Sequence, residues 1–227
     1  MRRRNPTLGL TEFWCRLRAR GYARKPESLY RVMKKQGYFK EEKPKKKYVP
    51  KPYEQMDYPG QRVQMDVKFV PRSCAAKKDE KYYQFTAIDE YSRLRYLEGF
   101  QENSSYSAAV FLKNASAFFK KHGFAIECVQ TDNGAEFTNR FTKATETPTL
   151  FQRTAASLGI KHKLIKPYTP RHNGKVERSH REDQKRFYSN RSFYSFNDFQ
   201  AQLAVYLKRS NNIPMCPLNF LSPVQFV

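Results

Sequence analysis

The sequence predicts an α/β domain built on a mixed five-stranded sheet with helices on both faces, preceded by a small helical segment. Three observations predict this fold class. Residues 62–70 alternate apolar and polar side chains, as a strand with one buried face does. Two further strand-like runs follow with only short connections, which favours antiparallel pairing. Beyond residue 104, helical and strand patterns alternate, which favours crossovers that place helices on the sheet.

Residues 1–39 predict two short helices. Apolar residues recur at helical spacing over 11–20, and Gly21 ends that helix. Pro26 opens a second helix, which Gly37 closes. Two basic helices with a short joint are typical of a helix-turn-helix, but also of a plain helical hairpin. We treat the segment as a partial helix-turn-helix-like DNA-binding segment, with the hairpin as the alternative.

Residues 40–60 are rich in Lys and Pro and have almost no aliphatic periodicity, which predicts a semi-extended basic linker. The sheet domain then runs over 61–227. Its first strand places Val63, Met65, Val67 and Phe69 on one face and Gln64, Asp66 and Lys68 on the other. The later elements are strands at 81–89, 94–100, 125–131 and 160–165, and helices at 105–122, 149–158, 174–189 and 196–210. We expect Val110, Phe111, Ala115, Phe118 and Phe119 to form the apolar face of the first of these helices.

The charge balance indicates a polyanionic partner. Lys and Arg number 43 against 21 Asp and Glu, a formal net charge of +22. Each phosphate that such a protein neutralises releases a counterion, although a ribosomal protein would have a similar balance. The four cysteines form no CxxC pair, which favours free thiols over disulfides or a zinc site. With neither an apolar run of roughly 18 residues nor a signal-peptide core, we expect a cytoplasmic protein.

Three acidic residues stand where a site could form. Asp66 lies within the first strand, and Asp132 follows the strand at 125–131, at a strand end where α/β sites tend to form. Glu177 falls in the first turn of the helix at 174–189. Each acid has an ordinary interpretation by itself: a solvent-facing strand residue, a turn initiator before Asn-Gly, and an acid that suits a helix N-terminus.

Together these acids predict a divalent metal site, because the expected topology makes the first and fourth strands neighbours. Carboxylate oxygens suit Mg²⁺ or Mn²⁺, and two such ions can activate the attacking oxygen and stabilise the leaving oxygen of a phosphodiester. The helix near Glu177 has no continuous apolar stripe. One face is expected to carry Glu177, His180, Arg181, Gln184 and Lys185, which suits a metal ligand among phosphate-binding cations, although a solvated helix would look similar.

Four segments make the sequence similar to a known family. They are QMDVKFV, FTAIDEYSRLRY, VQTDNGAEFTNRF and HKLIKPYTPRHNGKVERSHR. They run in the order found in the integrase core of bacterial insertion-sequence transposases, relatives of retroviral integrases. The resemblance covers residues 60–225, and the pair TDNGAEF and TPRHNGKVER carries most of its specificity.

The resemblance implies a ribonuclease H-like fold and a DDE-type transposase that cleaves and joins DNA with two Mg²⁺ or Mn²⁺ ions at Asp66, Asp132 and Glu177. It also implies a bacterial protein that associates with the nucleoid when bound to DNA and works as a homo-multimer on terminal repeats and target DNA. The residues expected to contact DNA are Lys175, Arg178, Arg181 and Lys185 on the helix, and Tyr168, His172 and Asn173 in the loop before it.

Two departures from the family pattern concern the site. The 44 residues between Asp132 and Glu177 exceed the usual spacing, and we expect the extra ones in the loop TKATETPTL. Gln184 stands where the family often has a basic residue. Because the chain opens inside what resembles the DNA-binding region, a truncated, inactive DNA-binding remnant or regulator is an alternative. A structure-specific nuclease on the same fold is another.

Overall fold

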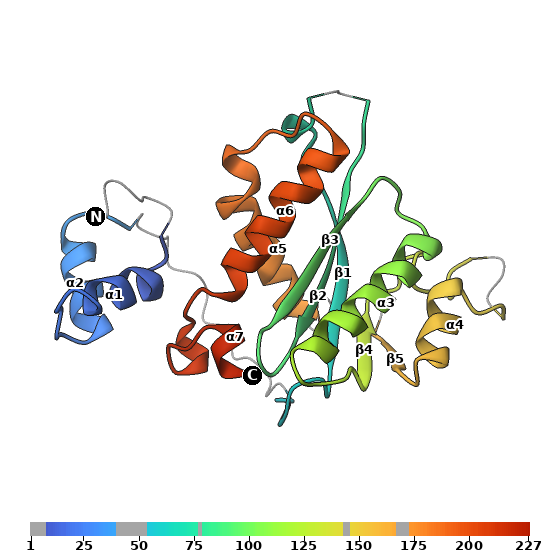
Figure 1. Ribbon diagram of the computed structural model, residues 1–227, viewed down its shortest axis with the longest axis horizontal. Helices are drawn as coiled ribbons and strands as arrows, with labels where there is room; N and C mark the ends of the chain where they lie inside the picture. Colours follow the sequence, from blue (N-terminus) through green and yellow to red (C-terminus); the bar gives the residue numbers. More distant parts are fainter. Residues whose placement is uncertain (1–7, 40–53, 77–78, 143–145, 167–172) are drawn as a thin grey trace.

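The computed structural model describes residues 8–39, 54–76, 79–142, 146–166 and 173–227. Its centre is a five-stranded sheet in the order β3-β2-β1-β4-β5 (Figure 1). The strands are β1 (Val63–Phe69), β2 (Tyr83–Asp89), β3 (Arg95–Phe100), β4 (Cys128–Thr131) and β5 (Lys161–Leu164). The predicted mixed sheet and the predicted order of its elements are confirmed.

Strand β1 is the middle strand of the sheet. It pairs antiparallel with β2, where Asp66 lies opposite Thr86, and parallel with β4, where Gln64 lies opposite Gln130. The β2–β3 pair is antiparallel and the β4–β5 pair is parallel. Since β1 and β4 run in the same direction, Asp66 and the residue that follows β4, Asp132, belong to the same end of the sheet.

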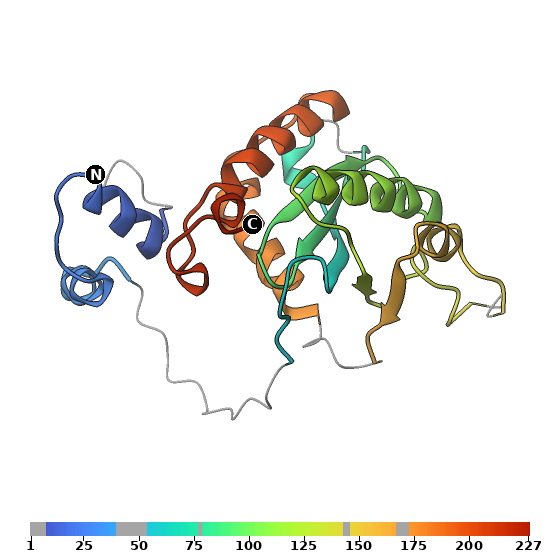
Figure 2. The same ribbon diagram turned by 60° about the horizontal axis from the view of Figure 1, so that its bottom comes forward.

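One face of the sheet is covered by α3 (Ser105–Lys121) and α4 (Leu150–Ser157) (Figure 2). Its core is apolar and consists mainly of Val63, Met65, Phe85, Ala87, Phe111, Leu112, Ala115, Phe119, Val129, Phe137 and Phe151. The expected apolar face of α3 is therefore correct at Phe111, Ala115 and Phe119. Val110 and Phe118 are only partly buried, because Ala108 and Leu112 occupy the stripe that points at the sheet.

The opposite face is covered by α5 (Gly174–Arg186) and α6 (Phe196–Asn211) (Figures 1 and 2). A second apolar cluster lies here, including Leu97, Phe187, Tyr188, Phe193, Phe199, Leu203 and Tyr206. Helix α6 comes very close to β3: a Cβ added at Gly99 would lie 2.5 Å from the ring of Phe199. Only a glycine leaves room for this approach.

The predicted N-terminal helices are present as α1 (Leu10–Arg18) and α2 (Pro26–Lys35). They share a small apolar cluster, and Trp14 contacts Phe220 with 4.9 Å between ring centroids. Phe220 precedes the short C-terminal helix α7 (Pro223–Phe226). The segment's suggested role as a helix-turn-helix remains a prediction. Within the described ranges, the helices are too short or too polar to cross a membrane.

Several boundaries differ from the expectations. Strand β4 begins at Cys128 rather than at 125, because the Glu127 N–H is bonded to the Gly60 carbonyl outside the sheet. Helix α5 ends at Arg186, and a separate 3-10 turn follows at Tyr188–Asn190. Part of the expected linker, 40–53, and part of the expected loop, 143–145, lie outside the described residues.

Candidate active site

Asp66 lies on the face of β1 that α5 covers, because Val63 and Met65 use the other face for the apolar core. Its side chain is 22% exposed, so it is not the solvent-facing strand residue that its type alone would suggest. One carboxylate oxygen, Oδ1, accepts the N–H of Val67 at 2.8 Å. The other, Oδ2, lies 3.5 Å from Nδ1 of His180.

Asp132 directly follows β4 and closes a tight turn. Its Oδ1 accepts the N–H of Gly134 at 3.0 Å, while Asn133 Nδ2 donates to the carbonyl of Ile165 at 3.1 Å. The turn interpretation of Asp-Asn-Gly is therefore correct. It is compatible with a place in the site, since the turn bond uses only one of the two carboxylate oxygens.

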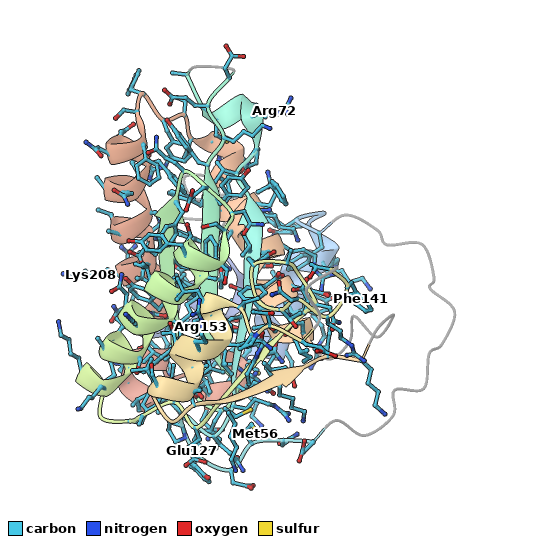
Figure 3. The ribbon with its side chains drawn as sticks, turned by 90° about the vertical axis from the view of Figure 1, so that its right-hand side faces the viewer. Met56, Arg72, Glu127, Phe141, Arg153 and Lys208 are labelled. Atoms are coloured by element: carbon cyan, nitrogen blue, oxygen red, sulfur yellow. The ribbon has the colours of Figure 1, made fainter. Side chains whose placement is uncertain are left out.

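The connection between β4 and α4 includes described parts of the segment TKATETPTL, and the placing of the extra residues between Asp132 and Glu177 in that segment remains a prediction. Asn139 Nδ2 ties the described parts of the connection together by donating to the Thr147 carbonyl at 2.8 Å, and Arg140 Nη1 donates to Asn133 Oδ1 at 3.4 Å. Figure 3 shows Phe141 of this connection on the opposite side of the molecule from Lys208 of α6.

Helix α5 has a buried face that is largely polar. Ser179 and Asp183 are buried together with Val176, and His180 also points inward, where its Nε2 lies 2.9 Å from Thr86 Oγ1. Arg181 is exposed on the opposite side. The expected shared face is correct for Arg181, Gln184 and Lys185, which are exposed, and half-buried Glu177 lies at its edge. It is wrong for His180, which faces the sheet. The inner stripe can be polar because the sheet offers buried polar partners for it.

The electrostatics of Asp66 show which acids surround it. Burial and the charge of Asp132 raise its pKa from 3.8 to about 7, and Glu177 and Glu136 add to the effect. Asp132 and Glu177 thus both lie within electrostatic range of Asp66. Glu136 was not predicted; the only available signal was its place in TDNGAEF. A Cβ added at Gly134 would lie 2.7 Å from the Glu136 carboxylate, so this acid folds back over the Asp132 turn.

An all-carboxylate donor set fits Mg²⁺ or Mn²⁺, and a carboxyl whose pKa is raised by neighbouring acids, as that of Asp66 is, is the arrangement that a divalent cation would relieve. The carboxylates are not drawn together into a ready coordination shell, however. Among the residues that the structure describes, no group of three or more His, Cys, Asp or Glu side chains is arranged to hold a metal ion. The chemistry of the carboxylate ligands therefore fits a divalent cation, but the ligands are not already arranged around a common point.

His180 is neutral at pH 7, because burial lowers its pKa to about 4. Its contact with Asp66 is therefore not an ion pair. Thr86 Oγ1 already accepts a hydrogen bond from Gln84 Nε2 at 3.0 Å, so its proton is available for His180 Nε2. This arrangement favours the tautomer with the proton on Nδ1, which points at Asp66.

The predicted DNA-contacting residues fall into three groups. Arg178, Arg181 and Lys185 are exposed on α5. Lys175 and Asn173 serve the fold: Lys175 Nζ donates to the Glu90 carbonyl at 2.8 Å, and Asn173 is 2% exposed and donates to the Met65 carbonyl at 3.3 Å. Tyr168 and His172 lie outside the described residues. A role in DNA binding remains a prediction for all seven.

The fold resembles that of retroviral integrases. A chain of an intasome of simian T-cell lymphotropic virus, solved in complex with the PP2A regulatory subunit B56 gamma, aligns with a TM-score of 0.61 and 21% identity over 81% of this chain and 60% of that one. The integrase catalytic core domain of HTLV-2, solved with magnesium in a trimeric form, aligns with a TM-score of 0.51 and 19% identity over 74% of this chain and 96% of that one. These likenesses support the ribonuclease H-like fold.

Sequence comparison gives the family. A putative integrase of Spiroplasma virus SpV1-C74, ORF3, is 30% identical over 178 residues, which are 73% of this chain. The chain spans about half the length of that relative, 48%. One integrase core domain model matches residues 57–170, half of the chain, and a second matches residues 158–213. These matches contain Asp66 and Asp132 in the first and Glu177 in the second, and they establish that this chain belongs to the integrase core domain family.

Proposed function

We propose that this chain is a transposase or integrase that cleaves DNA strands and joins them to a target during transposition, with Asp66, Asp132 and Glu177 as its metal-binding catalytic residues. One observation carries the proposal. Burial and the charges of Asp132 in the turn after β4, Glu177 in the first turn of α5 and Glu136 act together to raise the pKa of one half-buried acid, Asp66 of β1. Such a concentration of negative charge is costly in a protein that binds no cation.

The reaction consists of a phosphodiester hydrolysis followed by a phosphodiester exchange. In the first step, water attacks the phosphorus at the element end, the bond from phosphorus to the 3′-oxygen breaks, and a 3′-hydroxyl and a 5′-phosphate remain. In the second, that 3′-hydroxyl attacks a target phosphorus and displaces a target 3′-oxygen. The first step is a hydrolysis, whereas in the second step one phosphodiester forms for the one that breaks, so joining needs no external energy source. Two divalent cations, when bound, would lower the barrier by stabilising the attacking and leaving oxygens.

The residues of this chain would supply the ligands and the grip on DNA. Asp66, Asp132 and Glu177 would hold the cations through their carboxylate oxygens. Neutral His180, which is anchored to Thr86 through Nε2, would orient the Asp66 carboxylate through Nδ1. The exposed cations Arg178, Arg181 and Lys185 extend outward along α5 from Glu177 and would bind phosphates beside the site. The net charge of +22 suits long contact with a polyanion.

We further propose that the chain works as a multimer on two element ends and a target, in the cytoplasm of a bacterial host. Joining two ends requires two active sites at a fixed separation. The retroviral relatives support this partnership by analogy, since one forms part of an intasome and the other is a trimer with magnesium.

The test is a strand-transfer assay with Mg²⁺ on pre-cleaved duplexes that carry the ends of the source element. Wild type should give joined product, Asp132→Asn should give none, and Asp79→Asn should match wild type because Asp79 is an exposed acid in the β1–β2 connection. Equal product from wild type and Asp132→Asn would refute the assignment.

The inactive DNA-binding regulator remains the second candidate, and one observation favours it: in the described ranges, no group of three or more His, Cys, Asp or Glu side chains is arranged to hold a metal ion. Its signature would be DNA binding by wild type, measured by mobility shift, without joined product at any Mg²⁺ concentration. A nuclease without joining activity would instead give cleaved but unjoined strands.

A further inference from the structure

Helix α5 begins without a cap of its own. Its first amides need acceptors, as at every helix N-terminus, but the N-cap residue Asn173 makes no side-chain capping bond. The acceptor comes from a different element. Gln64 of β1 points its Oε1 at the helix and accepts the N–H of Lys175 at 3.0 Å and the N–H of Val176 at 3.1 Å.

Gln64 is held firmly at its other end. Its side chain is fully buried, and its Nε2 donates to Oε1 of Glu90 at 3.0 Å. Glu90 in turn accepts from Arg62 Nε at 2.6 Å and from Lys175 Nζ at 3.1 Å. Both the amide oxygen and the amide nitrogen of Gln64 are therefore engaged by buried partners, which leaves its orientation little freedom.

The position of this link connects two acids of the candidate site. Gln64 lies two residues before Asp66 on the same face of β1, and the amides it binds lie one and two residues before Glu177. We infer that Gln64 is a positioning residue that fixes the separation of the Asp66 and Glu177 carboxylates by capping α5 from β1. The inference rests on the proposed function, because only a shared cation makes that separation matter.

A second buried glutamine offers a matched comparison. Gln84 of β2 is also fully buried and also binds α5, but its Nε2 donates to Asp183 Oδ2 at 2.8 Å, in a later turn than Glu177. Gln84→Met and Gln64→Met each remove a buried amide at almost constant volume. A general loosening of α5 would follow from both variants, whereas a change in the Asp66–Glu177 separation should be larger in Gln64→Met, because only Gln64 binds the amides next to Glu177.

The first measurement is hydrogen exchange of individual amides in metal-free, DNA-free protein. In Gln64→Met, the Lys175 and Val176 amides should exchange about tenfold faster, because each loses its hydrogen-bond acceptor, and tenfold is the equivalent of about 1.4 kcal/mol. Gln84→Met should leave their relative protection unchanged. Unchanged protection in Gln64→Met would show that Gln64 is not the cap and would overturn the inference.

The second measurement is the Mg²⁺ concentration needed for half-maximal thermal stabilisation and, separately, for half-maximal strand transfer. Both concentrations should rise by about tenfold in Gln64→Met, the equivalent of roughly 1.4 kcal/mol of Mg²⁺ binding free energy lost because the ligands are misplaced. Excess Mg²⁺ should restore joining. Gln84→Met should raise the Mg²⁺ requirement less than Gln64→Met does, because Gln84 reaches the site only indirectly, through Thr86 and Asp183. Equal rises in both variants would reduce Gln64 to an ordinary stabilising residue and overturn the inference.

A double variant covers the case in which Gln64→Met does not fold. Gln64→Glu with Glu90→Gln exchanges the amide and the carboxylate, keeps an acceptor for the two helix amides and leaves the net charge unchanged. It should recover wild-type protection at Val176 and a near wild-type Mg²⁺ requirement, and failure to recover either would count against the cap. A wild type that Mg²⁺ does not stabilise would instead refute the proposed metal site, and with it the positioning role, independently of the exchange result.

Discussion

The two faces of the sheet are both buried, but they are held together by different chemistry. Under α3 and α4 the contacts are almost entirely apolar, with Phe85, Phe111 and Phe119 among the largest buried side chains. Under α5 the sheet presents buried polar side chains, among them Gln64, Gln84, Thr86 and Arg95. Apolar packing depends on volume and tolerates substitution, whereas hydrogen bonds are directional and leave an unsatisfied group when one partner is lost. The candidate site lies on the face under α5, where hydrogen bonds fix the orientation of the side chains.

The centre of the polar face is Asp183, which is fully buried. It accepts from Arg95 Nη1 at 2.7 Å, from the Tyr206 hydroxyl at 2.8 Å and from Gln84 Nε2 at 2.8 Å. Arg95 also donates to Ser210 Oγ at 3.0 Å. Three elements, β2, β3 and α6, thus meet one carboxylate on α5. Such a network fixes the orientation of the helix, which apolar contacts alone would leave freer to slide.

The largest expected effect compares one residue from each face. Asp183→Ala strands the buried Arg95 charge and should cost about 3–5 kcal/mol, and Phe111→Ala should cost about as much through a cavity. Urea unfolding measures both. At a temperature where both variants stay folded, only Asp183→Ala should lose strand transfer, because only it releases the helix that carries Glu177.

The milder pair Asp183→Asn and Phe111→Leu serves if the first pair unfolds. Equal loss of joining activity at equal loss of stability would mean that the two faces contribute to the site in the same way, and the distinction between them would be wrong.

The next effect is a pH dependence of the metal-free protein. The pKa of Asp66 rises from 3.8 to about 7 on folding, so between these values the folded chain keeps a proton that the unfolded chain has lost. Stability from this group is therefore lost as pH rises through that window. The groups that face it are Asp132, Glu136, Glu177, neutral His180 and Lys68.

Asp66→Asn removes this cost. In EDTA at pH 8 the variant should be more stable than wild type by about 2–3 kcal/mol, and the difference should vanish near pH 4. Mg²⁺ should stabilise wild type only. Thermal unfolding at a series of pH values measures this, and a variant that is less stable than wild type at pH 8 would contradict the crowding of carboxylates on the polar face.

A smaller effect tests the packing of α6 beside the polar network. A Cβ at Gly99 would lie 2.5 Å from the buried Phe199 ring, so Gly99→Ala should cost roughly 1–2 kcal/mol through overpacking. Phe199→Leu in the same chain should recover part of that loss. Gly174→Ala is the control, because a Cβ there meets no atom within 4 Å. If chemical unfolding gives the same loss of stability for Gly99→Ala and Gly174→Ala, then α6 does not approach β3 as closely as described.

The difference between the faces also explains how much the sequence predicted. Alternation in β1 correctly assigned Val63 and Met65 to the core and placed Asp66 on the other face. The same rule suggested that the other face meets solvent, yet Gln64 is fully buried. Helix α5 lacks an apolar stripe, so the pattern could not show that Asp183 is buried; its partner Arg95 lies 88 residues earlier. Local periodicity detects apolar burial but cannot detect a polar face that a distant element satisfies.

The smallest expected effect comes from a comparison of the N-terminal caps of α3 and α5, two helices that cover opposite faces of the sheet. Helix α3 is capped by its own Ser104, whose Oγ accepts the Ser107 N–H at 3.1 Å, whereas α5 is capped by Gln64 from another strand. Ser104→Ala should cost about 1 kcal/mol and leave the Mg²⁺ dependence of strand transfer unchanged, since α3 supplies no residue to the site. A shifted Mg²⁺ requirement in Ser104→Ala would mean that any weakened helix disturbs the metal ligands, and that the origin of a cap, local or distant, makes no difference to the site.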